Sequence, residues 1–195
     1  MKNFLFGVLS FLMAAVLMAA LPTEAEAEIY SDTLRLHILA ASDSDEDQAL
    51  KLKVRDAILA RYSTALSESD GLESSLAAIE VLLPQIEKTA EECIKKNGYE
   101  YNLTATLGEE WYDTREYEDF SLPSGKYFSL IIKIDNGRGK NWWCVMYPPM
   151  CLDMALGAPS DDWVSDYTDN ELLLIKGGKY NVKFKLLEMI SDFID

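Results

Sequence analysis

The stretch PSGKYFSLIIKIDNGRGKNWWCVMYPPMCL, residues 123–152, carries the pattern that decides the fold. An apolar run at 126–134 is followed by the turn sequence DNGRGK at 135–140 and by a second β-type run, NWWCVMY, at 141–147. Two β-type runs joined by a short Gly-containing segment are typical of a β-hairpin. We therefore predict that 126–134 and 141–147 are paired strands of one hairpin.

Further strands are expected upstream of this stretch. Residues 34–39 (LRLHIL) and 101–107 (YNLTATL) alternate in the manner of short strands. The segment 108–122 is acidic and aromatic without a regular period, and we expect it to be irregular. A short helix or strand is expected at 171–175.

Apolar residues recur at every third or fourth position in three segments, which predicts helices there. The first helix runs to about Tyr62, the second spans 71–96 as a single helix kinked at Pro84, and the third covers 182–194. We expect the second helix to bury Leu72, Leu76, Ile79, Leu83, Ile86, Ala90 and Cys93. The sequence thus predicts one α+β domain, with a small, mostly antiparallel sheet packed against two or three helices.

The first helix is preceded by an acidic segment, SDSDEDQ at 42–48. Its alternating Asp residues suggest an EF-hand, but the sixth position from Asp43 is Gln48 rather than Gly, and the twelfth is Val54 rather than Glu. We instead predict that Asp43 or Ser44 caps the helix. The basic residues Lys51, Lys53 and Arg55 are expected to face away from its buried side.

The N-terminus reads as an export signal. A short positive start precedes an apolar run at 4–21, Pro22 ends it, and Ala25-Glu26-Ala27 has the small-x-small pattern of a cleavage site. Residues 1–27 are therefore predicted to be a signal peptide, followed by one domain at 28–195. A run of this length also fits a retained membrane anchor, and that alternative stays open.

The charge of the chain limits its partners. With a net charge of −15, the chain lacks the basic surface that nucleic acids require. The GRGK run at 137–140 lacks the spacing of a phosphate-binding loop and joins two strands, so no nucleotide or other cofactor is expected.

A catalytic or metal site finds little support in the sequence. His37 is the only histidine, and Cys-only zinc ligands at suitable spacing are missing, so no metal site is expected. The alternative function is an exported hydrolase that uses His37 with Ser42 or an acid pair such as Asp43 and Asp45. We expect a protein that is not an enzyme.

Cys144 and Cys151 flank a Pro-Pro pair and are separated by six residues. In an exported protein they are candidates for a disulfide, which would leave Cys93 as a free thiol. A metal pair and a redox pair are the alternatives, although further ligands and C-x-x-C spacing are missing.

Three segments together resemble one known family. They are LRLHILAASDSDEDQALKLKVRDAIL at 34–59, TREYEDFSLPSGKYFSLIIKIDNGRGKNWWCVMYPPMCL at 114–152 and VKFKLLEMI at 182–190. This pattern resembles stage II sporulation protein R, and NWWCVMYPPMC after the Gly-rich turn is its most specific part.

The resemblance implies a secreted developmental signal. Such a protein is exported from the forespore into the space between the two septal membranes. There it activates a membrane-embedded aspartic protease of the mother cell, stage II sporulation protein GA, which processes the sigma-E precursor. The resemblance assigns no catalytic or binding residues.

Aromatic and Arg side chains in loops are the types that protein interfaces favour as hot spots. We therefore expect the protease contacts to lie in 111–120 and 136–143. The candidate residues are Trp111, Arg115, Tyr117, Arg138, Lys140, Trp142 and Trp143. The alternative for the Trp pair is that one or both rings fill the core.

Overall fold

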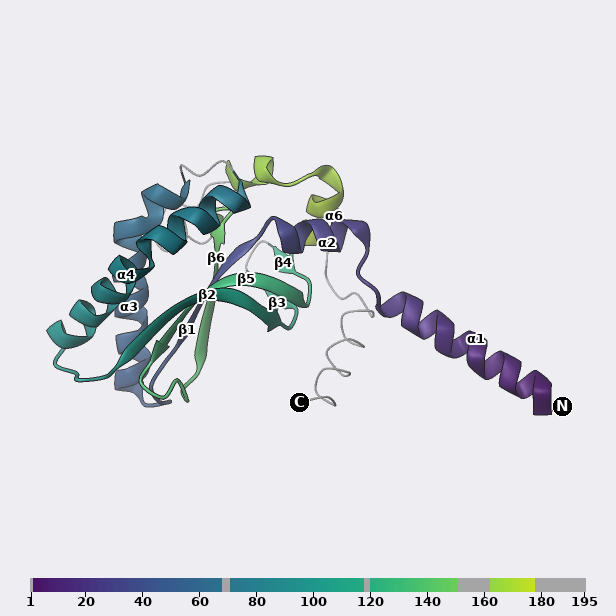
Figure 1. Cartoon of the computed structure of the whole chain (residues 1–195), viewed down its shortest axis with the longest axis horizontal. Helices are drawn as coiled ribbons and strands as arrows, with labels where there is room; N and C mark the ends of the chain where they lie inside the picture. Colours follow the sequence, from purple (N-terminus) through teal and green to yellow (C-terminus); the bar gives the residue numbers. More distant parts are fainter. Residues whose placement is uncertain (1, 68–70, 118–119, 151–161, 178–195) are drawn as a thin grey trace. The chain divides into compact units, whose positions relative to one another are not determined.

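The structure, a computed structural model, describes residues 2–67, 71–117, 120–150 and 162–177 (Figure 1). The chain divides into two compact units, which are described separately below, and the single domain at 28–195 stays a prediction. Unit 1 comprises Met1–Ile29, Trp111–Gly125 and Thr168–Asp195, and unit 2 comprises Tyr30–Glu110 and Lys126–Tyr167. Both units combine segments that are distant in the chain, which is why periodicity along the sequence does not show the division.

Unit 2 is built on a four-stranded sheet in the order β2-β5-β1-β6 (Figure 1). Its strands are β1 (Leu34–Leu39), β2 (Leu103–Tyr112), β5 (Gly125–Ile134) and β6 (Asn141–Tyr147). β1 pairs in parallel with β5 and antiparallel with β6. The predicted strands are therefore present, but the predicted hairpin is wrong, because β1 lies between β5 and β6.

The composition of β1 explains its central position. Leu34, Leu36 and Ile38 are fully buried on one face, and Arg35 and His37 are buried on the other. A strand with both faces buried is stable only inside a sheet with neighbours on both edges. The turn at 135–140 is long enough to cross the end of β1, so it connects two strands that are not adjacent.

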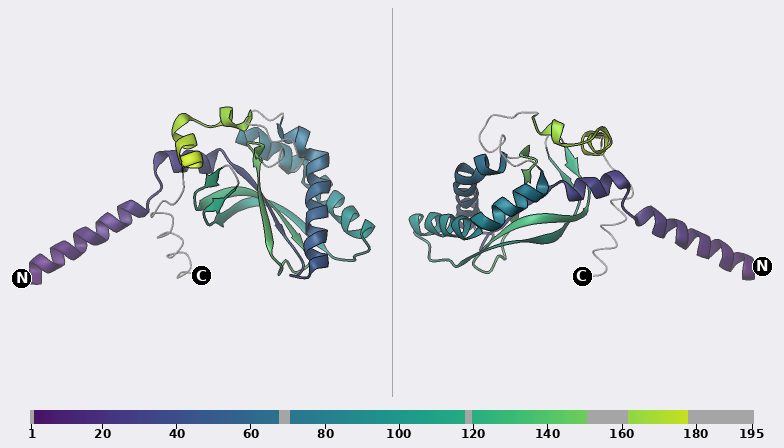
Figure 2. Two further views of the ribbon diagram at one scale, coloured as in Figure 1. Left: turned by 180° about the vertical axis from the view of Figure 1, so that it is seen from behind. Right: turned by 45° about the horizontal axis from the view of Figure 1, so that its top comes forward.

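Two long helices, α3 (Asp45–Ser67) and α4 (Leu72–Lys96), pack against each other and lie on the same side of this sheet (Figures 1 and 2). Of the residues predicted for the inner face of α3, four are buried and Ala57 is half-buried. The buried residues are Leu50, Val54, Ile58 and Tyr62. As predicted, α4 continues as one helix through Pro84.

The buried stripe of α4 differs from the prediction at several positions. Ile79, Ile86 and Ala90 are buried as expected, whereas the other predicted residues are half-buried: Leu72, Leu76, Leu83 and Cys93. Ser75 and Ile94 are buried instead. Cys93 is a free thiol of intermediate exposure. Ile86, Ala90 and Ile94 follow one another at steps of four residues, whereas the prediction took a step of three from Ala90 to Cys93. The buried face therefore rotates slightly along the helix.

The strand β2 is longer than the predicted strand at 101–107 and includes residues expected to be irregular. Glu109 forms a 2.6 Å ion pair with Lys126 of β5, and Glu110 forms a 2.7 Å ion pair with His37 of β1. These partners are supplied by the sheet itself. Tertiary contacts therefore outweigh the weak strand preference of glutamate here.

Unit 1 contains α1 (Lys2–Ala20), most of α2 (Glu24–Ser31), the short antiparallel pair β3 (Arg115–Glu116) and β4 (Ser121–Leu122), and α6 (Asp169–Gly177). The helix α6 confirms the element expected at 171–175. The antiparallel pairs β3–β4 and β1–β6 bear out the expected α+β class with mostly antiparallel strands.

The helices α2 and α6 both begin with reciprocal capping interactions. The Thr23 backbone N–H donates to Glu26 at 2.5 Å, and the Glu26 N–H donates to the Thr23 hydroxyl at 3.3 Å. Thr168 and Glu171 form the same pair at the start of α6, at 2.7 and 3.4 Å. Each Glu is buried, so these pairs fix both helix starts.

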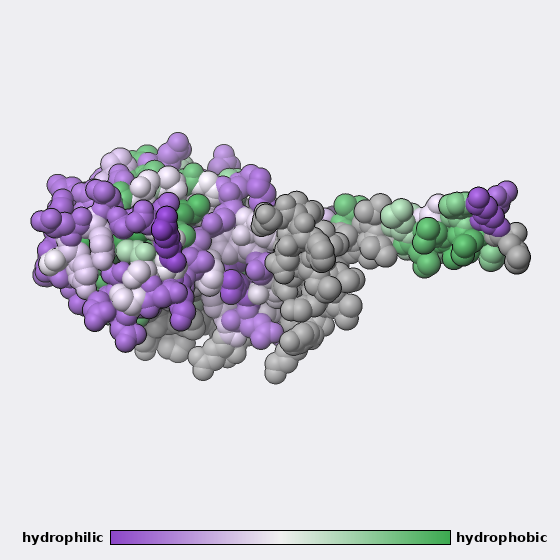
Figure 3. Space-filling view, turned by 90° about the horizontal axis from the view of Figure 1, so that it is seen from below, coloured by the Kyte–Doolittle hydropathy of each residue, from purple (hydrophilic) through white to green (hydrophobic). Residues whose placement is uncertain are grey.

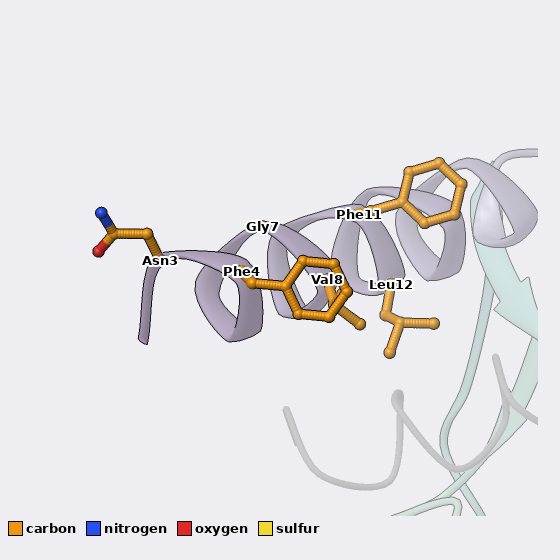
Figure 4. Close-up of a pocket in the computed structure, with 6 residues that line it drawn as sticks. All are labelled: Asn3, Phe4, Gly7, Val8, Phe11 and Leu12. Atoms are coloured by element: carbon orange, nitrogen blue, oxygen red, sulfur yellow. The ribbon is translucent and has the colours of Figure 1, made fainter. Parts of the chain in front are cut away.

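The helix α1 carries exposed apolar side chains, including Phe4, Leu5 and Phe11, and appears hydrophobic in Figure 3. A shallow hollow on α1 is lined by Asn3, Phe4, Gly7, Val8, Phe11 and Leu12 (Figure 4). Within the described residues, no helix combines the length and apolar character needed to cross a membrane. The predicted boundary at residue 27 stays a prediction.

Candidate partner-binding site

The turn at 135–140 reaches β6 by passing close over the end of β1. The Gly139 N–H donates to the carbonyl oxygen of Ala40 at 2.9 Å. A Cβ atom at position 139 would overlap the carbonyl oxygen of Ser42 and come within 3.0 Å of the Ala40 Cβ. Glycine is therefore required here by the close approach of two backbone segments.

Lys140 is held by its backbone, while its side chain is exposed. Its N–H donates to Asp43 Oδ1 at 2.6 Å, and its carbonyl oxygen accepts from Lys51 Nζ at 2.9 Å. The Lys51 ammonium also donates to Gln48 Oε1 at 2.7 Å. The turn is thus fixed to the start of α3 from two directions.

Lys51 itself contradicts the predicted outward orientation, because it is 4% exposed. Burial is the main cause that lowers the pKa of Lys51. Asp43 acts in the opposite direction, while Lys140 and Arg55 lower it further. Lys51, Lys140 and Arg55 are therefore three cations that interact electrostatically.

The acidic segment before α3 acts as a helix start, as predicted. The hydroxyl of Ser44 accepts from the Asp47 N–H at 3.2 Å, which identifies Ser44 as the cap. The Asp47 carboxylate accepts from the hydroxyls of Ser42 at 2.5 Å and Tyr101 at 3.1 Å. The hydrogen bond to Asp47 is the largest cause that raises the pKa of Tyr101.

The two tryptophans of β6 face opposite sides of the sheet, as neighbouring residues in a strand do. Trp142 lies opposite Ile38, and the Arg55 guanidinium lies over its ring at 4.9 Å from the centroid. Trp143 lies opposite His37, and the two rings stack at 5.5 Å. Both Trp side chains are half-buried, so both contribute to packing and both keep exposed surface.

The hydrolase alternative would require the Ser42 hydroxyl to bond to His37, and that hydroxyl bonds to Asp47 instead. The Nδ1 atom of His37 contacts Glu110 Oε2 at 2.7 Å. Asp43, the acid considered in the alternative function, accepts the N–H of Lys140. The structure therefore engages His37, Ser42 and Asp43 in separate structural contacts. Sequence reasoning missed Glu110, because a contact 73 residues away leaves no local pattern.

The remaining predicted contacts lie in unit 1. Trp111 is 49% exposed. Arg115 pairs with Leu122 in the β3–β4 ladder, and the Tyr117 ring stacks on Phe120 at 4.4 Å. The predicted surface is thus divided: Trp111, Arg115 and Tyr117 belong to unit 1, and Arg138, Lys140, Trp142 and Trp143 belong to unit 2.

The cysteines agree in part with their predicted states. Cys144 is buried in β6 and disulfide-bonded, whereas Cys93 on α4 is free. Burial raises the pKa of the Cys93 thiol. Cys151 lies outside the described residues, so its pairing with Cys144 stays a prediction.

The family model of stage II sporulation protein R matches residues 30–156, which is more than half of the chain. This chain belongs to the stage II sporulation protein R family. Stage II sporulation protein R of Bacillus subtilis (strain 168) is 36% identical over 130 residues, which cover 66% of this chain and 58% of that protein. The chain therefore spans less than two thirds of that relative. No solved structure matches this chain.

The stretch that matches the stage II sporulation protein R family begins before β1 and ends after β6. It includes every strand of the unit 2 sheet, both of its long helices, and the segment Trp111–Gly125. All seven predicted contact residues lie within it. Membership supports a role in sporulation.

Proposed function

We propose that this protein is an exported sporulation signal that activates a membrane-embedded aspartic protease of the mother cell. The protease is stage II sporulation protein GA, and its activation leads to processing of the sigma-E precursor. Membership of the stage II sporulation protein R family is the observation that carries this proposal. The protein acts as a ligand and performs no catalysis itself.

The contacts of unit 2 support a ligand rather than a hydrolase. The sequence offers His37, Ser42 and Asp43 as a catalytic group, but each side chain has a different partner within the fold. Their contacts join β1 to β2, the segment before α3 to α3, and the same segment to the turn before β6. These residues therefore stabilise a surface, and the activity that we propose depends on what that surface binds.

Export is the second part of the proposal. The exposed apolar side chains of α1 suit a segment that is recognised by an export apparatus, and Ala27 precedes the proposed cleavage site. The cleaved protein would occupy the space between the septal membranes. Mass spectrometry of the unreduced, then alkylated protein should find Glu28 as the first residue and an oxidised Cys144–Cys151 pair. An intact N-terminus would instead indicate a retained anchor.

The function is tested by deleting the gene in a sporulating host and measuring processing of the sigma-E precursor on immunoblots. Processing should stop in the deletion strain and return when the wild-type gene is supplied. A strain that lacks the exporting segment 1–27 should accumulate the protein without processing. Normal processing in the deletion strain would overturn the proposal.

A further inference from the structure

The part of unit 2 around Trp142 has an unusual charge for this chain. The protein has a net charge of −15, yet three cationic residues, Arg55, Arg138 and Lys140, lie near this one indole in the fold or in the sequence. Arg55 contacts the ring directly, and Lys140 and Arg138 precede it by two and four residues. We call these four residues the basic patch.

We infer that the basic patch binds an acidic segment of a partner protein. The inference rests on the proposed function for the identity of that partner, but the patch itself is defined by the Arg55–Trp142 contact and by two exposed cations of the turn that leads into β6. Arg138 and Lys140 are exposed, and among the described residues neither side chain forms an ion pair. Their charges are therefore available to a ligand.

The central cation of the basic patch is held in place before any ligand arrives. Arg55 donates from Nε to Asp56 Oδ1 at 2.8 Å, and its guanidinium lies over the Trp142 ring. Its side chain is 21% exposed, so one part remains accessible. A side chain that is already ordered loses little conformational entropy on binding.

A fourth cation supports the basic patch from inside the protein. Lys51 is buried below the turn, and its Nζ donates to the carbonyl oxygen of Lys140 at 2.9 Å. Its hydrogen-bond acceptors are neutral oxygens: the carbonyls of Lys140 and Asn141 and the side chain of Gln48. Its charge therefore adds to the positive potential that a ligand meets.

Two acids, Asp43 and Asp56, lie close to the cations of the basic patch. The effect of the remaining acidic residues depends on how large a surface the ligand covers. Asp43 accepts the Lys140 N–H, and Asp56 is paired with Arg55. Charges farther away are screened over about 8 Å at physiological salt. A narrow acidic peptide meets mainly the basic patch, whereas a flat anionic membrane also meets other parts of a chain whose net charge is −15. Peptide is therefore the occupant that the charges favour.

The test compares the full wild-type chain with the variant Arg55→Gln/Arg138→Gln/Lys140→Gln. The probe is a fluorescein-labelled peptide of alternating Glu and Ser, and the Gln–Ser peptide is its uncharged counterpart. Wild type should bind the Glu–Ser peptide, and the variant should bind it about tenfold more weakly, because two exposed cations and one half-buried cation are lost. The control Lys88→Gln/Lys95→Gln/Lys96→Gln removes the same charge from α4 and should bind as wild type does.

Each result decides the inference. If the triple variant loses its thermal transition, Arg138→Gln/Lys140→Gln changes only exposed side chains and takes its place. Equal binding by wild type and patch variant, or equal loss in the α4 control, would overturn the inference. So would charge-dependent binding to phosphatidylglycerol over phosphatidylcholine vesicles without peptide binding, which indicates a membrane site.

The same variants in a sporulating host separate the inference from the proposed function. The patch variant should reduce processing of the sigma-E precursor while the α4 control supports it. Normal processing by a patch variant that binds no peptide overturns the patch as the partner site and leaves the proposed function intact. Failure of the proposed function would instead be shown by normal processing of the sigma-E precursor in the deletion strain.

Discussion

The Lys51 ammonium donates a 2.9 Å hydrogen bond to the carbonyl oxygen of Lys140, although 89 residues separate the two in the chain. This bond connects the inner face of α3 to the turn that leads into β6. Lys51→Met keeps most of the volume but leaves two part-buried carbonyl oxygens, those of Lys140 and Asn141, without their donor. We expect the free energy of unfolding to fall by about 2 kcal/mol, measured by urea denaturation.

The matched control for this change is Lys88→Met. The Lys88 side chain is 76% exposed on α4, so its replacement should change the free energy of unfolding by no more than about 0.5 kcal/mol. Equal effects of the two substitutions would contradict a structural role for Lys51.

Gly139→Ala should destabilise unit 2 through a backbone clash. The new Cβ would overlap the Ser42 carbonyl oxygen, which belongs to the backbone and cannot rotate away. The expected loss is about 2 to 3 kcal/mol in urea denaturation. Gly108→Ala is the control, since a Cβ there meets nothing within 4 Å. A stable Gly139→Ala protein would show that the turn does not pass this close to Ser42.

Substitutions of His37 distinguish the proposed ligand from the alternative hydrolase. His37→Ala loses both the Glu110 contact and the Trp143 stack, so we expect about 2 kcal/mol of destabilisation. His37→Gln retains a hydrogen-bond donor and should support processing of the sigma-E precursor. Sporulating cells that carry each variant, with protein levels matched, provide the measurement. A folded His37→Gln protein without any activity would revive the hydrolase.

The raised pKa of Tyr101 predicts that the folded protein loses stability in alkaline solution. Its hydrogen bond to Asp47 raises its pKa above 10.0 in the folded chain. The folded protein therefore keeps this proton when the unfolded chain has lost it. The resulting stabilisation is complete below pH 10 and decreases as pH rises through the higher folded value.

Ultraviolet titration of tyrosinate can measure this effect, with Tyr101→Phe used to isolate one of the ten tyrosines. Asp47→Asn removes the charge that favours the protonated phenol and should move the Tyr101 titration towards 10.0. An unchanged titration would mean that Tyr101 and Asp47 are not bonded in solution.

Elements with strong local patterns could be predicted from the sequence. The bounds of β1 and β6 agree with the predicted strands, because apolar residues alternate along β1 and aromatic residues are dense in β6. Ser44 was one of two predicted caps of α3, and Asp43 serves the turn instead. Local chemistry is enough for such features.

Features that depend on distant partners could not be predicted in the same way. The turn at 135–140 fits a hairpin by its length, and nothing local reveals that β1 enters between its strands. Lys51 looks like a surface residue until the carbonyls of residues 140 and 141 are brought to it. In the candidate site, the Arg55–Trp142 contact was missed for the same reason.

The position of β1 sets the order in which the protein can fold. Leu34 pairs with Phe128 on one side and Tyr147 on the other, so both neighbours of the central strand are synthesised long after it. Such non-local pairing is slow, because a long loop must close before any contact is gained. The nascent chain therefore remains incomplete until Tyr147 is available. For a protein that we propose is threaded across a membrane, this delay keeps the chain in a state that a translocation channel accepts.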